Sequence, residues 1–203
     1  MLPRPCLMLV TDRHQCKGDL VSAVAAAVKG GVHAVQLREK DLSASELVAL
    51  GRSLQQAIAG HAIFLVNDRA DVAAALGADG VHLPENGLPA QAARLLLPHP
   101  RLVGRSVHSV EGALKAAAEG VDYLVFGNVY ETGSHPGFPA AGIPRLQEVV
   151  SAVAVPVLAI GGVTAARVSE LRAAGAAGVA VISAVLGVRD PRKAADDLAA
   201  VFR

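Results

Sequence analysis

The chain has 203 residues and a net charge of +1, and 52% of its residues are hydrophobic although only 3% are aromatic. This length suits one domain with a full core, and the near-neutral charge without a basic run argues against a nucleic-acid surface. Apolar stretches are broken well short of a membrane span, and Cys6 and Cys16 show neither a disulfide framework nor metal-ligand spacing. We therefore expect a cytoplasmic protein that handles small molecules and binds neither nucleic acid nor membrane.

Short apolar runs alternate with alanine-rich helical runs along the whole chain. The predicted strands are residues 6–11, 34–38, 63–67, 80–83, 102–107, 123–129, 155–160 and 178–182. The predicted helices lie near residues 20–29, 44–59, 70–76, 89–97, 110–118, 144–153, 164–173 and 191–202. Eight such units without a linker predict one α/β domain over residues 1–203, a (β/α)₈ TIM barrel. An open doubly wound sheet is the alternative, but no GxGxxG motif follows the first strand.

Local signals mark several helix starts and one long loop. Ser43 with Glu46 three residues later resembles a capping box, and Pro89 and Pro191 suit a first helical position. Residues 131–142 contain three glycines and two prolines, which disfavour regular structure. Because this loop follows the sixth strand, we expect it on the catalytic rim as a lid.

The carboxyl ends of the predicted strands carry most of the polar residues that could do chemistry, and in a barrel they meet at one rim. The alternation within residues 36–40 directs Gln36 and Arg38 into the barrel mouth, where an Arg fork suits phosphate or carboxylate. A solvated charge run is the alternative. Asp68 is suited either to bind Mg²⁺ or to pair with Arg38.

Two glycine- or serine-containing turns follow the last two strands and predict a phosphate site. Gly161 and Gly162 end one strand, and Ser183 and Ala184 end the next. Backbone N–H groups at helix starts favour anions, and in barrels phosphate commonly sits after the last two strands. The alternative is that both turns are only tight connections.

A set of short motifs runs through the chain in order. They are VTD at 10–12, QLREK at 36–40, VNDR at 66–69, GADGVHL at 77–83, GRSVH at 104–108, IGG at 160–162 and VISA at 181–184. Together they resemble the thiamine phosphate synthase/TenI superfamily. One branch of that family joins a pyrimidine diphosphate to thiazole phosphate with Mg²⁺, and the TenI branch isomerises a thiazole phosphate.

Resemblance to the synthase branch implies roles for a set of rim residues. It assigns pyrimidine and diphosphate binding to Gln36, Arg38, Lys40 and Asn67, the metal to Asp68, the diphosphate and rim loop to Ser106, Thr132 and Ser134, and thiazole phosphate to Gly162 and Ser183. Two family positions differ here, since Gly87 stands at the second metal carboxylate and His135 at the loop lysine. Glu85, two residues from Gly87, is the candidate to replace that carboxylate.

Resemblance to the TenI branch is closer in GRSVHS at 104–109, which adds Arg105 to the substrate-binding set, and in FGNVYET at 126–132. That branch has a histidine for proton transfer where Asn128 stands, and an amide cannot move a proton at neutral pH. His108 and His135 are therefore the candidate proton carriers, alongside Asn128 as a ligand-binding group. Their alternatives are a hydrogen bond within the rim for His108 and a solvated loop position for His135.

The leading hypothesis is a tautomerase of thiamine biosynthesis that binds thiazole phosphate and needs no cofactor. The second hypothesis is a thiamine phosphate synthase, which would use Mg²⁺. The third is a non-catalytic regulator that binds thiazole or thiamine phosphate. The expected partner is the small-molecule thiazole phosphate, and a homo-oligomer is possible.

Overall fold

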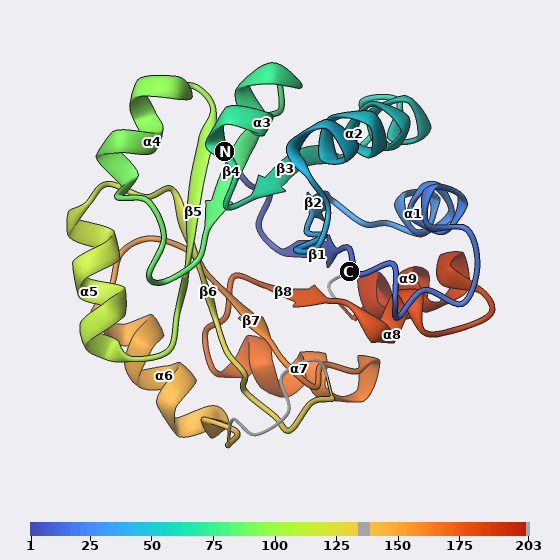
Figure 1. The fold of residues 1–203 in the computed structure, drawn as a ribbon. Helices are drawn as coiled ribbons and strands as arrows, with labels where there is room; N and C mark the ends of the chain where they lie inside the picture. The colour runs from blue at the N-terminus through green and yellow to red at the C-terminus, as the bar shows by residue number, and fades with distance from the viewer. Residues whose placement is uncertain (134–138, 202–203) are drawn as a thin grey trace.

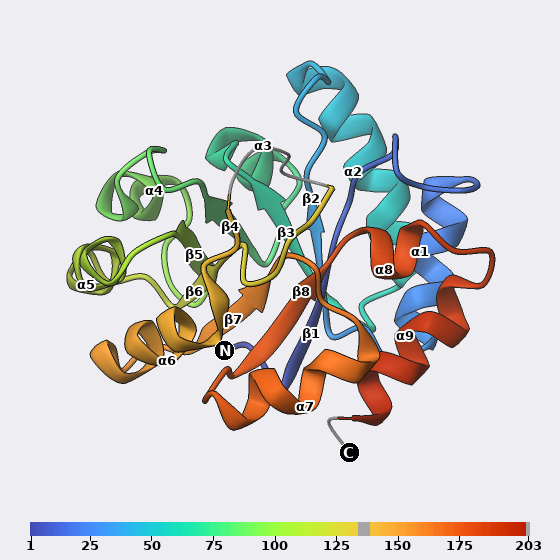
Figure 2. The same ribbon diagram turned by 90° about the horizontal axis from the view of Figure 1, so that it is seen from below.

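The computed structural model describes residues 1–133 and 139–201. Eight parallel strands form a closed barrel in the order β1 to β8, and helices surround them (Figure 1). The view from below shows the same ring of helices, with α1 beside α9 (Figure 2). The predicted (β/α)₈ barrel is confirmed.

The element bounds follow the predicted series closely. The strands are β1 (Cys6–Val10), β2 (Ala34–Leu37), β3 (Ile63–Asn67), β4 (Gly80–Leu83), β5 (Leu102–Val107), β6 (Tyr123–Phe126), β7 (Val157–Ile160) and β8 (Gly178–Val181). The helices are α1 (Leu20–Lys29), α2 (Ala44–Ile58), α3 (Ala70–Ala75), α4 (Ala90–Leu96), α5 (Val110–Ala118), α6 (Gly142–Ala152), α7 (Ala165–Ala173), α8 (Ser183–Leu186) and α9 (Pro191–Ala200).

The largest difference from the predicted bounds lies at the end of β6. The strand ends at Phe126, not at residue 129. Val129 instead lies across the end of β7, where its N–H donates to the carbonyl oxygen of Ile160 at 2.9 Å. An apolar run alone does not distinguish such a crossing from a continued strand, because both bury the same side chains.

Helix capping explains why several helices begin where they do. Ser43 and Glu46 form the predicted capping box at α2, and the Asp190 side chain accepts the N–H of Lys193 just before Pro191 opens α9. Pro89 is the N-cap of α4 and not its first helical residue, so this helix begins one residue later than predicted. The Ser43 and Asp190 side chains satisfy N–H groups that have no partner within the helix, whereas Pro89 makes no side-chain capping hydrogen bond.

The core follows from strands that are buried on both faces. Every residue of β1, β2, β4, β6 and β8 is buried, as expected for parallel strands between a filled barrel and a layer of helices. Within residues 1–133 and 139–201, we find no helix with the length and apolar character needed to cross a bilayer.

Candidate active site

A cavity of about 1100 Å³ opens at the carboxyl ends of the strands. Most of the predicted site residues line it, although they come from six different strand ends and loops. They are Gln36, Arg38, Lys40, Asn67, Asp68, Ser106, His108, Asn128, Thr132, Gly161, Gly162, Ser183 and Ala184. These residues therefore lie around one cavity, and the role of each stays a prediction.

Arg105 is the predicted substrate residue that lies outside the cavity lining. Its guanidinium donates to the carbonyl oxygens of Glu85 (3.0 Å) and Leu88 and pairs with Glu119 at 3.4 Å. Strand alternation explains this, because a neighbour of the cavity-lining Ser106 points to the opposite face. Arg105 therefore supports the β4–α4 loop from behind.

Ser134 and His135 lie outside the described residues. Their predicted roles in the rim loop and in proton transfer stay predictions, as does closure of the 131–142 loop.

The β2–β3 side of the cavity presents an amide pair and a cation. Gln36 Nε2 donates to Asn67 Oδ1 at 3.0 Å, which orients both amides. Arg38 makes no salt bridge among the residues that the structure describes, and partial burial lowers the pKa of its guanidinium. The carboxylates of Asp12 and Glu39 act on this cation only from beyond salt-bridge distance, and they partly oppose the shift. A partly desolvated cation that forms no salt bridge in the described chain suits an anionic ligand.

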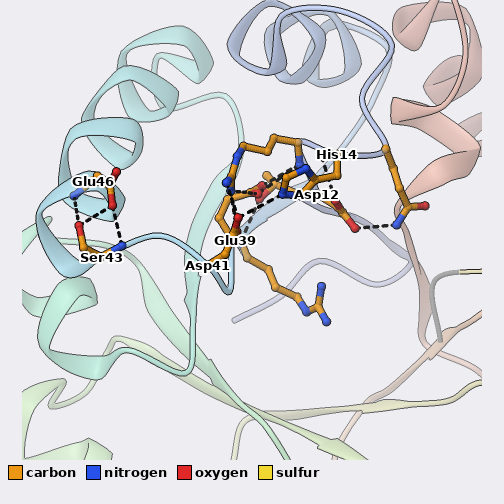
Figure 3. Close-up of polar contacts among 10 residues, drawn as sticks. Asp12, His14, Glu39, Asp41, Ser43 and Glu46 are labelled. Carbon is orange, nitrogen blue, oxygen red and sulfur yellow. Dashed lines mark hydrogen bonds and ion pairs between the residues drawn. The ribbon is translucent and has the colours of Figure 1, made fainter. Parts of the chain in front are cut away.

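The segment that carries Arg38 and Lys40 is held by an ionic network between the loops after β1 and β2 (Figure 3). The carboxylate of Glu39, whose side chain is 1% exposed, accepts the backbone N–H of Arg13 at 3.1 Å and its Nη1 at 3.2 Å. Arg13 Nη1 also donates to Asp41 at 2.7 Å. Arg13 and His14 hold the pKa of the Asp41 carboxyl below its usual range.

His82 lines the cavity from β4 and is 2% exposed. Its Nε2 lies 2.9 Å from Ser106 Oγ and its Nδ1 lies 3.1 Å from Tyr123 Oη. Burial, reinforced by Arg105 and Arg38, lowers the pKa of His82 to about 3, so the imidazole is neutral at physiological pH.

The candidate proton carrier His108 is paired with Glu85. Its Nδ1 lies 2.7 Å from Glu85 Oε2, and its backbone N–H donates to Glu85 Oε1 at 3.1 Å. Both side chains line the cavity. Gly87 follows Glu85 by two residues, and a Cβ added there would lie 2.8 Å from the Pro84 ring. The loop conformation therefore leaves no ready space for a carboxylate at position 87.

Asp68 is the other carboxylate at this rim. It has a φ of 62°, and its N–H donates to the carbonyl oxygen of His82 at 2.8 Å. Across the described ranges, no group of three or more His, Cys, Asp or Glu side chains is arranged to hold a metal ion. Metal binding here would need oxygens from the ligand as well.

The glycine turn after β7 is required by its neighbours. Gly161 has a φ of 96°, and an added Cβ would lie 2.3 Å from the Cβ of Asn128. At Gly162, with a φ of 63°, a Cβ would lie 2.5 Å from the Glu131 carbonyl oxygen. Contact with the chain after β6 is thus sufficient reason for both glycines, and the predicted phosphate site remains a prediction.

The first residues after β6 are anchored to α7. Tyr130 donates from its hydroxyl to Glu170 at 2.6 Å, and the Arg167 guanidinium lies 4.3 Å from the centre of its ring. Arg167 also donates to the Gly162 carbonyl oxygen at 2.6 Å. These contacts tie the base of the rim loop to the turn after β7.

Comparison with known proteins gives matches over almost the whole chain. A family model described as thiamine monophosphate synthase matches residues 7–185. The chain belongs to the thiamine monophosphate synthase/TenI superfamily. A relative from Geobacter sulfurreducens, named putative thiamine-phosphate synthase, is 48% identical over 97% of this chain and 93% of its own.

Two further matches support the same family. A thiamine-phosphate synthase from Methanoculleus marisnigri is 45% identical over 95% of this chain and 92% of its own. A solved structure of a thiamine phosphate pyrophosphorylase from Pyrococcus furiosus has a TM-score of 0.88 and 37% identity, over 98% of this chain and 95% of that one. Fold and family therefore agree across nearly all of both chains.

The prediction of a tautomerase as the main function is wrong. It gave most weight to residues 104–109 and 126–132, whereas relatives with 37–48% identity over nearly the whole chain are named thiamine-phosphate synthase. Both branches were expected to bind a thiazole phosphate, so short motifs around that ligand discriminate poorly between them.

Three residues at the site received no role from the sequence. Tyr123 is not among the predicted site residues, and Glu39 and His82 occur only within the motifs at 36–40 and 77–83. A signal for Tyr123 was present, since it is one of only two tyrosines and lies in a predicted buried strand. A buried Tyr hydroxyl normally has a hydrogen-bond partner.

Proposed function

We propose that this superfamily member is a thiamine phosphate synthase, a transferase that joins a pyrimidine diphosphate to thiazole phosphate. The observation that carries the proposal is that one cavity contains both predicted ligand sets. Side-chain donors at the ends of β2, β3 and β5 suit a diphosphate, and the turns after β7 and β8 suit a monophosphate. The names of the relatives support the same reaction.

Joining the two substrates requires the diphosphate to leave, so negative charge increases on its oxygens. Arg38 supplies a partly buried cation that forms no salt bridge in the described chain, and the Gln36 and Asn67 amides, which line the same cavity, are oriented by their mutual hydrogen bond. Donors that are already oriented toward developing charge stabilise a transition state most effectively. We assign Arg38 the largest single contribution.

The carboxylates at the rim fit Mg²⁺, which proteins commonly bind through one or two carboxylates together with substrate phosphates. Asp68 lines the cavity and makes no salt bridge within the described ranges, and Glu85 lines it from the β4–α4 loop. Asp68 and Glu85 would hold the ion, Glu85 in place of a carboxylate at Gly87. When bound, Mg²⁺ would offset charge on the diphosphate.

The test incubates the protein with a pyrimidine diphosphate, thiazole phosphate and Mg²⁺ and measures thiamine phosphate by mass spectrometry. We expect product only when both substrates are present, and loss of product when EDTA removes the metal. Arg38→Ala should lower kcat/KM by about 100-fold. Arg145→Ala is the matched control, because Arg145 pairs with Glu148 on the surface of α6. Binding of both substrates without product would contradict the proposal.

A further inference from the structure

A hydrogen-bonded chain of three side chains links three neighbouring strands at the wall of the cavity. It runs from Tyr123 on β6 through His82 on β4 to Ser106 on β5, with contacts of 3.1 and 2.9 Å. Tyr123 is fully buried and His82 is 2% exposed, whereas Ser106 is partly exposed and lines the cavity. The chain therefore connects the closed interior to the cavity wall.

Gly104 makes this connection possible. It is the register partner of both His82 on β4 and Tyr123 on β6. An added Cβ at Gly104 would lie 2.1 Å from Cζ of Tyr123 and 2.5 Å from its hydroxyl oxygen. The tyrosine ring thus occupies the space that a β5 side chain would fill, and its hydroxyl reaches a histidine two strands away.

The direction of the hydrogen bonds follows from counting donors. The Tyr123 hydroxyl is fully buried, and among the described residues its hydrogen-bond partner is His82 Nδ1, so its proton is directed at that nitrogen. His82 is 2% exposed and has no carboxylate partner in the described chain, so the imidazole carries one N–H. If Tyr123 donates to Nδ1, then Nε2–H donates to Ser106 Oγ. The opposite direction leaves the Tyr123 proton without an acceptor among the described residues, and an unpaired buried donor is unfavourable.

We infer that Tyr123 and His82 are positioning residues that set Ser106 to present its hydroxyl proton to the cavity. With one Ser106 lone pair occupied by His82 N–H, the remaining strong interaction of the hydroxyl is to donate. A donor in this place selects an anionic oxygen over a cationic or donor-only group. This inference rests on the proposed function in one respect, that the anion is the diphosphate of the pyrimidine substrate.

The first test is a double-mutant cycle on Tyr123→Phe and Ser106→Ala, with inorganic diphosphate binding measured by calorimetry. We expect Ser106→Ala to weaken binding by about tenfold and Tyr123→Phe by several-fold, since a hydrogen bond to a charged group is lost or reversed. Because Tyr123 acts through Ser106, the double variant should bind no more weakly than Ser106→Ala. Equal effects of Tyr123→Phe in both backgrounds, or no effect of it alone, would overturn the inference.

A second test uses two replacements of His82 that keep different halves of the ring. In His82→Gln the amide nitrogen takes the place of Nε2 and still donates to Ser106, whereas in His82→Asn the amide reaches only toward Tyr123. We expect His82→Gln to retain most of the diphosphate affinity and His82→Asn to lose as much as Tyr123→Phe. Equal losses in both, with the same melting temperatures, would mean that His82 only fills space.

These measurements separate the inference from the proposed function. Diphosphate binding with the expected cycle, but no thiamine phosphate from both substrates, would leave the positioning role standing and contradict the synthase. Formation of thiamine phosphate, together with additive effects of Tyr123→Phe and Ser106→Ala on diphosphate binding, would support the synthase and contradict the positioning role. In the active enzyme, Tyr123→Phe should raise KM for the pyrimidine diphosphate and leave KM for thiazole phosphate unchanged.

Discussion

Two polar networks support the same cavity and differ in how they handle charge. The network between the loops after β1 and β2 is ionic, with Arg13 between the carboxylates of Glu39 and Asp41. The network inside the barrel is neutral, from Tyr123 through His82 to Ser106. Near the rim, water reaches Arg13 and Asp41 and reduces the cost of their charges. Inside the barrel an ion without a partner would be far more costly, so neutral groups are used.

The two networks also control different things. Glu39 accepts a backbone N–H and so fixes the path of the chain that carries Arg38 and Lys40. His82 contacts one side chain of the cavity wall and so fixes the orientation of a single hydroxyl. Disrupting the first should move several ligand groups together, and disrupting the second should affect one.

The largest effect is expected where the neutral network has no space to adjust. Gly104→Ala places a methyl group 2.1 Å from the Tyr123 ring, which is enclosed on all sides. We expect a loss of about 3 kcal/mol in the free energy of unfolding, at the upper end for an overpacked core. Urea denaturation measures it. Gly18→Ala is the control, because a Cβ there would meet nothing within 4 Å; similar stabilities of the two variants would show that the barrel can move Tyr123 aside.

A smaller loss is expected from the ionic network. Glu39→Ala removes a buried carboxylate that accepts from the backbone and side chain of Arg13. We expect about 2 kcal/mol of destabilisation, the scale for hydrogen bonds to a charged group, together with a higher KM for the pyrimidine diphosphate. Glu148→Ala, which breaks an exposed pair on α6, should change neither quantity. Loss of stability without any change in KM would limit Glu39 to a structural role.

Mild acid should distinguish the networks further. The pKa of His82 is about 3 in the folded protein against an ordinary value of 6.5, so below pH 6.5 the unfolded chain binds a proton that the folded chain does not. The contribution of His82 to the free energy of unfolding is therefore fully present above pH 6.5. It falls as the pH is lowered below that value, by about 1 kcal/mol per pH unit. Burial lowers the pKa of His33 in the same direction, so the measurement is the difference between wild type and His82→Gln from pH 6.5 to 5. Parallel curves would contradict a neutral buried His82.

The smallest effect is expected at the exposed end of the ionic network. Asp41→Asn breaks the pair with Arg13 where the Asp41 side chain is 53% exposed, and exposed ion pairs contribute little in water. We expect the melting temperature of Asp41→Asn to be close to that of wild type. The difference between the two should be no larger than the change in melting temperature that added salt causes in either protein. A loss as large as that of Glu39→Ala would show that the network acts as one unit.

Most of the predicted side chains line the cavity, although their roles stay predictions, whereas the predicted reaction was wrong. Thirteen predicted residues line the cavity because strand ends in a barrel converge, whatever the exact strand bounds. Arg105 could not be separated from Ser106 by type, only by the face to which each points. The reaction was misjudged because Asn128 and the flanking motifs surround a ligand site that both branches share.

By itself, the sequence determined the barrel, since eight alternating apolar and helical runs have few other ways to bury both faces of a parallel sheet. It also determined the α2 and α9 starts, because the capping side chains and the groups that they satisfy lie within a few residues of each other. The tertiary structure alone decided that Glu39 supports Arg13 across 26 residues and that Tyr123 reaches His82 across 41. Such pairs depend on barrel register and on the missing side chain of Gly104, which no local pattern specifies.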